Sequence, residues 1–155
     1  MQGQNKLKIL FVAAEVAPFA KTGGLADVAG SLPKMLTSMG NDVRIVMPRY
    51  RSIKCGMEYV TDFPVQMNGK METCIVRETE MSYEVDCKKG RLPVYFLDSY
   101  NYFDRDGIYC FHDDAERFSF FCSAVLDMLP KISFQPDVIH CNDWHTGPIC
   151  MLLNA

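Results

Sequence analysis

The chain has 155 residues, of which 48% are hydrophobic, so it is long enough for one globular domain with a sizeable core. Its formal net charge is −3 at pH 7, and its 16 Lys and Arg are scattered instead of forming a basic run, which argues against nucleic acid as a partner. The seven cysteines include no Cys-x-x-Cys pair, which argues against a zinc clip and a disulfide framework and predicts reduced thiols in a cytoplasmic protein.

The first apolar segment lies in the amino-terminal stretch MQGQNKLKILFVAA, where it is too short to span a membrane and lacks a cleavage pattern. We therefore expect neither a targeting segment nor a membrane partner. It is instead the first of four short apolar runs, each bounded by polar or turn residues, that predict strands buried on both faces of a parallel sheet. The four runs cover residues 7–12, 43–47, 94–97 and 138–140.

Helices are predicted between these runs. Apolar residues spaced at three and four positions give the first helix one apolar face, and Gly40 ends it. Pro33 falls inside the pattern, so we expect a kink there or a restart near Ser31. A second helix is predicted over 115–129, and a third begins within TGPICMLLNA, residues 146–155. The residues of the first apolar face are Leu25, Val28, Ala29, Leu32, Met35, Leu36 and Met39.

The middle of the chain, residues 54–90, alternates polar and apolar residues and carries turn signals at Asn68-Gly69 and Lys89-Gly90, so antiparallel hairpins are expected. No repeat or linker divides the chain. The order of elements predicts one α/β domain over residues 1–155. Its fold class is a Rossmann-like, doubly wound, mostly parallel sheet with a β-hairpin excursion.

Four loops that follow the parallel strands are rich in charged and aromatic residues. Doubly wound sheets bind ligands beyond the carboxyl ends of their strands, so we expect these loops to meet at one edge and to form the binding site. The loops are AEVAPFAKTGG, PRYRS, DSYNYFDRDGIY and CNDWHTG.

The sequence KTGG, at residues 21–24, stands at the start of the first predicted helix. Gly23 and Gly24 would let the backbone turn sharply and approach a ligand, and the helix amino terminus and Lys21 would favour an anion such as phosphate. The motif matches neither a P-loop nor a G-x-G-x-x-G fingerprint. The alternative, given equal weight from the residues alone, is that Thr22 caps the helix and Lys21 is merely solvated.

Other polar clusters favour structural interpretations. His140, Cys141, Asp143 and His145 could be drawn as a metal site, but adjacent strand residues point to opposite faces, so no metal is expected. Trp144 is either core or a stacking platform for sugar. The acidic stretch FHDDAERF, residues 111–118, is expected to cap a helix. No two acids stand at a separation that would indicate a glycoside hydrolase.

The stretches KILFVAAEVAPFAKTGGLADVAGSLPKML, DVRIVMPRY and PDVIHCNDWHTG closely resemble the amino-terminal domain of bacterial glycogen synthases and plant starch synthases. The resemblance covers essentially the whole chain. It implies the first half of a two-domain GT-B glycosyltransferase that extends an α-1,4-glucan with retention. It also implies ADP-glucose as the usual donor, with UDP-glucose as the alternative, and no cofactor or enzyme nucleophile.

The resemblance also assigns site residues. Lys21 matches the lysine that contacts the donor's phosphates and sugar, and Gly24 the glycine that lies against the donor. Asp27 could instead complement the helix dipole, and Asp143 and His145 could orient their loop. The predicted donor-binding residues are Lys21, Gly23, Gly24 and Asp27, the catalytic residues Asp143 and His145, and the acceptor or cleft residues Glu15, Trp144 and Tyr100.

Members of this family continue through further strands and a whole second domain. We therefore expect this chain to be an excised or truncated domain without meaningful transferase activity alone, whose missing partner is the carboxy-terminal domain of the same enzyme. A stand-alone glucan-binding or regulatory module is the competing hypothesis, and a different two-domain glycosyltransferase is a third.

Overall fold

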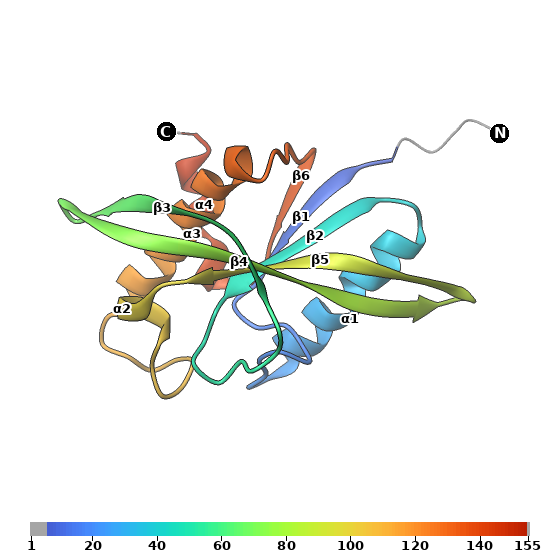
Figure 1. Cartoon of the computed structure of the whole chain (residues 1–155), viewed down its shortest axis with the longest axis horizontal. Coiled ribbons are helices and arrows are strands. Elements are labelled where there is room, and N and C mark those ends of the chain that lie inside the picture. The colour runs from blue at the N-terminus through green and yellow to red at the C-terminus, as the bar shows by residue number, and fades with distance from the viewer. Residues whose placement is uncertain (1–5, 155) are drawn as a thin grey trace.

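The computed structural model describes residues 6–154, which form a six-stranded sheet with helices on both sides (Figure 1). The strand order is β3-β4-β5-β2-β1-β6. The strands are β1 (Lys8–Val12), β2 (Asp42–Pro48), β3 (Glu58–Met67), β4 (Lys70–Val85), β5 (Lys88–Asp98) and β6 (Val138–Cys141). The helices are α1 (Gly24–Ser38), α2 (Tyr100–Phe103), α3 (Asp114–Lys131) and α4 (Pro148–Leu152), with a 3-10 turn, η1 (Trp144–Thr146).

Strands β1, β2, β5 and β6 are parallel, and β1 lies between β2 and β6. Residues Leu10 to Val12 are fully buried because helices cover both faces: α1 lies on one side of the sheet and α3 on the other (Figure 1). The chain winds from β1 to β2 in one direction and from β5 back to β6 in the other. This confirms the predicted doubly wound sheet, and it places the reversal of winding between β1 and β6.

The middle of the chain forms the predicted hairpins, because β4 pairs antiparallel with both β3 and β5. The two hairpin turns lie at opposite ends of the molecule (Figure 1). The first turn is at Asn68-Gly69, as predicted, with φ values of 50° and 75°. Both angles are in the left-handed region that this type of hairpin turn requires.

The second turn is not where the sequence predicted it. The chain reverses at Asp86 and Cys87, with φ values of 46° and 64°, whereas Gly90 lies inside β5 opposite Tyr83. A Cβ atom on Gly90 would be 2.8 Å from the Tyr83 hydroxyl oxygen. The prediction of a Lys89-Gly90 turn was wrong because this glycine makes room for an aromatic ring on the neighbouring strand.

Helix α1 is one continuous helix, so Pro33 does not make it restart near Ser31. Proline has no amide to donate within the helix, and the Thr37 hydroxyl donates to the Pro33 carbonyl at 2.8 Å one turn later. Gly40 follows the helix with φ 100° and donates its amide to Thr37 at 2.9 Å. This confirms that Gly40 ends the helix.

The buried face of α1 differs from the predicted apolar face. The buried residues include Ala26, Ala29 and Gly30, whereas Val28 and Met35, although part of the apolar pattern, are exposed. A Cβ atom on Gly30 would lie 2.7 Å from the carbonyl oxygen of Ala17, in the loop after β1. The small residues let α1 approach this loop closely, which the spacing of large apolar residues did not reveal.

The second helix, α3, begins one residue earlier than predicted and continues through Pro130 in its last turn. The third predicted helix is divided into η1 and α4. None of the helices within residues 6–154 has the length and apolar character needed to cross a membrane.

Candidate functional site

The loops that follow β1, β2, β5 and β6 contact one another at the carboxyl ends of the strands. The Tyr50 hydroxyl donates to the Ala14 carbonyl at 2.9 Å, which joins the loops after β2 and β1. The Tyr109 hydroxyl donates to Glu15 at 2.7 Å, and the Tyr109 ring stacks on His145 at 4.7 Å between centroids. These contacts confirm that the four predicted loops meet at one edge, beside the reversal between β1 and β6.

Glu15 is the centre of this cluster and is almost completely buried. Its carboxylate accepts hydrogen bonds from the amide and hydroxyl of Thr22, the amide of Gly23 and the hydroxyl of Tyr109. Burial would raise the pKa of Glu15, but these hydrogen bonds outweigh burial and lower its pKa below 4.5. Glu15 is therefore a buried carboxylate anion that fixes the start of α1, and its predicted place near an acceptor stays a prediction.

Neither Gly23 nor Gly24 needs to be glycine for its backbone conformation. Gly23 has an extended conformation (φ −148°), and Gly24 has helical geometry as the first residue of α1, so other residues could adopt both conformations. A Cβ atom on either glycine would meet no heavy atom within 4 Å. The expectation that the glycines permit a sharp turn was wrong, and what they provide is open space above the backbone at a helix amino terminus.

Lys21 and Asp27 form an exposed ion pair across this turn. The Lys21 Nζ atom donates to both carboxylate oxygens of Asp27, at 2.6 and 2.8 Å. Asp27 lies in the first turn of α1, where its charge also complements the helix dipole. Thr22 does not cap the helix, because its hydroxyl donates to Glu15 and the N-cap is Gly23.

The loop after β6 is held by its own backbone and by Asn142. The Asn142 side chain donates to the Val12 carbonyl at 2.8 Å, which ties the loop to β1. Asp143 has φ 65°, a left-handed conformation that few non-glycine residues adopt, and its carboxylate accepts from the Trp144 amide at 2.6 Å. The structure thus gives Asp143 a loop-orienting role, and its contact with a ligand stays a prediction.

His145 is buried among aromatic rings. It stacks on Tyr109, and the Phe118 ring approaches it edge-on at 4.6 Å. Burial lowers the pKa of His145 below 6.5, against the opposing effect of Asp143, Glu15 and Asp114, so the imidazole is neutral at pH 7. Its Nδ1 atom is buried and has no hydrogen-bond partner among the described residues.

The two predicted aromatic cleft residues have different surroundings. Trp144 is exposed, and its ring lies 4.1 Å from His145 between centroids and 5.4 Å from Phe118, so it is at the cluster. Tyr100 is 80% exposed and lines a separate hollow with Glu72 and residues of β4. The structure brings Tyr109, and not Tyr100, to Glu15.

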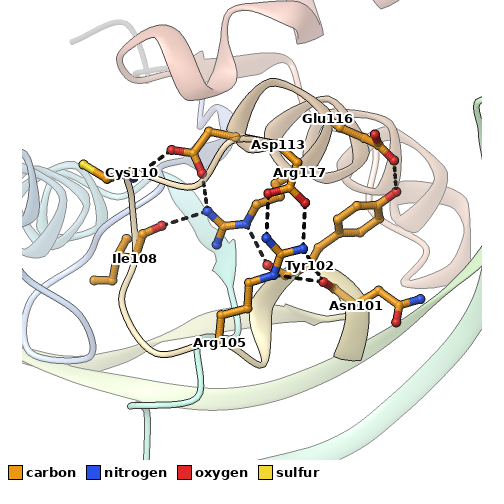
Figure 2. Close-up of polar contacts among 9 residues, drawn as sticks. Asn101, Tyr102, Arg105, Ile108, Cys110, Asp113, Glu116 and Arg117 are labelled. Atoms are coloured by element: carbon orange, nitrogen blue, oxygen red, sulfur yellow. Dashed lines mark hydrogen bonds and ion pairs between the residues drawn. The ribbon is translucent and has the colours of Figure 1, made fainter.

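The acidic residues at the start of α3 do not cap it. The side chain of Asp113, at the N-cap, makes no cap hydrogen bond and binds Arg105 instead, at 2.6 and 2.7 Å. Asp114 binds Arg117 at 2.5 Å, and Glu116 accepts from the Tyr102 hydroxyl (Figure 2). The capping prediction was wrong because Arg105, Arg117 and the Tyr102 hydroxyl bind these carboxylates instead.

No group of three or more His, Cys, Asp or Glu side chains suited to holding a metal ion occurs within residues 6–154. The cluster therefore offers other chemistry: backbone amides and a lysine for an anion, a carboxylate anion, a neutral imidazole and an exposed indole. This is the functional-group content of a site for a phosphorylated, hydroxyl-rich ligand.

The fold is a doubly wound α/β domain with a candidate ligand-binding site at its reversal of winding. A sequence model of the family described as "Starch synthase catalytic domain" matches residues 8–155. The glycogen synthases of Moorella thermoacetica and Desulforudis audaxviator are 57% and 56% identical to this chain, each over 96% of its length. The chain belongs to the family of starch synthase catalytic domains.

A solved structure agrees with this assignment. The catalytic domain of starch synthase IV from Arabidopsis thaliana, bound to ADP and acarbose, superimposes with a TM-score of 0.81 and 32% identity over 95% of this chain. This chain covers 30% of that structure, and it spans 29% and 31% of the lengths of the two bacterial relatives. The match confirms the predicted kind of fold, the first part of a GT-B glycosyltransferase.

Proposed function

We propose that this chain supplies the amino-terminal side of the cleft of a glycogen or starch synthase. The whole enzyme transfers glucose from ADP-glucose to the non-reducing end of an α-1,4-glucan with retention, and a carboxy-terminal domain supplies the other side of the cleft. The relatives' names and the ADP and acarbose bound to the Arabidopsis enzyme support this assignment. The seven unpaired cysteines fit a cytoplasmic location.

The open space above Gly23 and Gly24 is the observation that carries the proposal. Neither residue needs to be glycine for its backbone conformation or for packing. A ligand that lies against the backbone gives a reason for both glycines. The adjoining amino terminus of α1 and the Lys21 ammonium make an anion the favoured ligand, and the diphosphate of a nucleotide sugar meets that requirement.

Lys21 acts on the leaving group in this scheme. Negative charge builds on the diphosphate as the bond to glucose breaks, and an ammonium group held beside it stabilises that charge. Asp27 holds Lys21 at the turn before the donor arrives. Because this pair is exposed, Lys21 can exchange the carboxylate for a phosphate at small cost.

The other residues bind the sugars. His145 is neutral, so it can exchange hydrogen bonds with a glucose hydroxyl without adding charge. Trp144 offers an exposed ring for stacking against a sugar. The acceptor hydroxyl attacks the anomeric carbon of glucose from the same face that the diphosphate leaves, and its proton passes to the departing phosphate. No residue of this chain therefore acts as a nucleophile.

A fluorescence titration tests this proposal, since Trp144 is the only tryptophan. We expect ADP-glucose to change the emission of Trp144 in a saturable way, UDP-glucose to compete poorly, and Lys21→Ala to weaken the response. The matched control is Lys34→Ala, which removes a lysine of α1 that lies away from the KTGG motif. An equal response in Lys21→Ala and the unaltered chain would contradict the role of Lys21. A response to maltooligosaccharides alone would favour a glucan-binding module.

A further inference from the structure

The loop between α2 and α3, residues 104–113, carries Tyr109 into the site, and α3 holds the backbone on both sides of this residue. The carbonyl of Ile108, just before Tyr109, accepts from Arg117 Nη1 at 3.0 Å. The amide of Cys110, just after it, donates to Asp114 Oδ2 at 2.9 Å. Figure 2 shows both contacts converging from α3 on this short stretch of loop.

The two residues of α3 that make these contacts also bind each other. Arg117 Nη1 donates to Asp114 Oδ1 at 2.5 Å, and Arg117 Nε donates to the Tyr102 carbonyl at 2.7 Å. Arg117 is fully buried, and its guanidinium lies 4.5 Å from the centroid of the Phe111 ring. A buried ion pair often contributes no more stability than well-packed apolar residues would, so stability alone does not account for it.

The loop also has a conformation that needs external support. Cys110 has φ 71°, in the left-handed region that non-glycine residues seldom adopt. Such conformations persist where the surrounding structure determines them and are concentrated at functional sites. The hydrogen bond from the Cys110 amide to Asp114 is the contact that fixes this residue.

The side chain of Tyr109 has two further fixed points in the site. Its hydroxyl donates to Glu15 Oε1 at 2.7 Å, while Glu15 accepts from the amides of Thr22 and Gly23. Its ring stacks on His145, with an angle of 26° between the ring planes. Tyr109 thus spans the gap between the loop after β1 and the loop after β6.

We propose that Arg117 and Asp114 are positioning residues that act as a clasp on the backbone around Tyr109. The clasp holds Tyr109 between Glu15 and His145 and so sets the spacing between the KTGG segment at residues 21–24, called the glycine turn below, and the loop after β6. Its value for catalysis rests on the proposed function, because that spacing then shapes the donor site. Neither Arg117 nor Asp114 needs to contact a substrate in order to position Tyr109.

The first test measures loop order without any ligand, on the complete 155-residue chain. In Arg117→Lys and Asp114→Asn, exchange of the Cys110 amide, which donates to Asp114, should rise by about tenfold or more relative to amides of β1, which report global opening. The His145 ring, followed by NMR, should titrate closer to 6.5 as its aromatic cover loosens. Tyr109→Phe, which keeps the ring and removes the bond to Glu15, should leave the Cys110 amide protected.

Arg105→Lys is the matched control. Arg105 makes a bidentate pair with Asp113 in the same loop and does not bind the backbone next to Tyr109. Arg105→Lys should leave the exchange of the Cys110 amide and the His145 titration close to those of the unaltered chain. Equal acceleration of loop and β1 amides in the clasp variants, or an unchanged loop in folded variants, would overturn the proposal.

An ADP-glucose titration of the same variants separates this inference from the proposed function. A loosened loop with a weakened donor response supports both. A loosened loop with an unchanged donor response supports the clasp and counts against the donor-site assignment. An unchanged loop with a lost response overturns the clasp and leaves the donor site in place.

Discussion

The Lys21–Asp27 and Arg117–Asp114 pairs lie at the same edge of the sheet, with nearly equal N–O distances of 2.6 and 2.5 Å. The side chains of Lys21 and Asp27 are 53% and 57% exposed, whereas those of Arg117 and Asp114 are 0% and 18% exposed. Water already solvates the first pair, so a ligand can replace one partner at little cost. Removing a partner of the second leaves a buried charge unpaired. Solvent exposure thus distinguishes the Lys21–Asp27 pair, which is available for binding, from the Arg117–Asp114 pair, which maintains the fold around the site.

The largest effect is expected at the buried pair. Asp114→Ala, which strands the Arg117 guanidinium, should lower the free energy of unfolding by about 3–5 kcal/mol, because the buried charge loses its counterion. Urea denaturation followed by circular dichroism measures this change. The double variant Asp114→Ala with Arg117→Met should recover part of the loss, since no charge then stays buried. A loss below about 1 kcal/mol in the single variant would contradict the buried-pair interpretation.

A pair of glycine variants sharpens the same contrast along one helix. Gly30→Ala would place a Cβ atom 2.7 Å from the Ala17 carbonyl oxygen, so we expect it to cost about 1–3 kcal/mol of stability. Gly24→Ala, which meets nothing within 4 Å, should leave the melting temperature unchanged or slightly raised. The same Gly24→Ala variant should weaken the response of Trp144 to ADP-glucose. Similar melting temperatures for both variants would show that α1 does not need its close approach to Ala17.

The buried side of the site should also respond to mild acid. Because the pKa of His145 is lowered below 6.5, the unfolded chain binds a proton before the folded chain does. His145 therefore reduces stability as pH falls below 6.5, by at most about 1.4 kcal/mol per pH unit. Urea midpoints at pH 7.5, 6.5 and 5.5 should fall less steeply in His145→Gln. If the urea midpoints of the unaltered chain and of His145→Gln fell in parallel with pH, His145 would take up a proton as readily in the folded chain as in the unfolded chain.

The smallest effect on stability is expected at the exposed pair. Lys21→Ala and Asp27→Ala should each change the free energy of unfolding by less than about 1 kcal/mol, because water and salt screen this pair. Thermal melts at low and high salt measure the change. A loss of several kcal/mol would show that the pair maintains the glycine turn, and the contrast between the two pairs would then fail.

Local sequence patterns predicted the elements of this fold, and they failed where contacts depend on distant residues. The buried parallel strands and the Asn68-Gly69 turn follow from short patterns that any window of the chain displays. Gly90 was misassigned as a turn because the ring that explains it belongs to Tyr83, on the neighbouring strand. A glycine alone does not reveal whether it serves conformation or space.

For the candidate site too, local patterns predicted part of the arrangement and missed the contacts between distant residues. The KTGG motif and the loop after β6 pointed to the edge of the sheet where the four loops meet, because strand ends and loop composition can be read locally. The sequence did not reveal that Glu15 binds Thr22, Gly23 and Tyr109, the last of them 94 residues away. It also did not reveal Arg117, which in the sequence is one more charged residue of an amphipathic helix and in the structure is fully buried. Both roles depend on tertiary contacts.

The place of β1 between β2 and β6 has a consequence for biosynthesis. This strand leaves the ribosome before the other five strands, yet one of its neighbours is β6, and the bond from the Lys8 amide to Asp137 spans 129 residues. At translation rates of about 5–20 residues per second, one edge of β1 waits about 6–26 seconds for its partner. The pairing of β1 with β6 is therefore the last strand pairing of the described sheet that can form. Until then, chaperones that bind extended apolar segments have access to the strand from which the glycine turn begins.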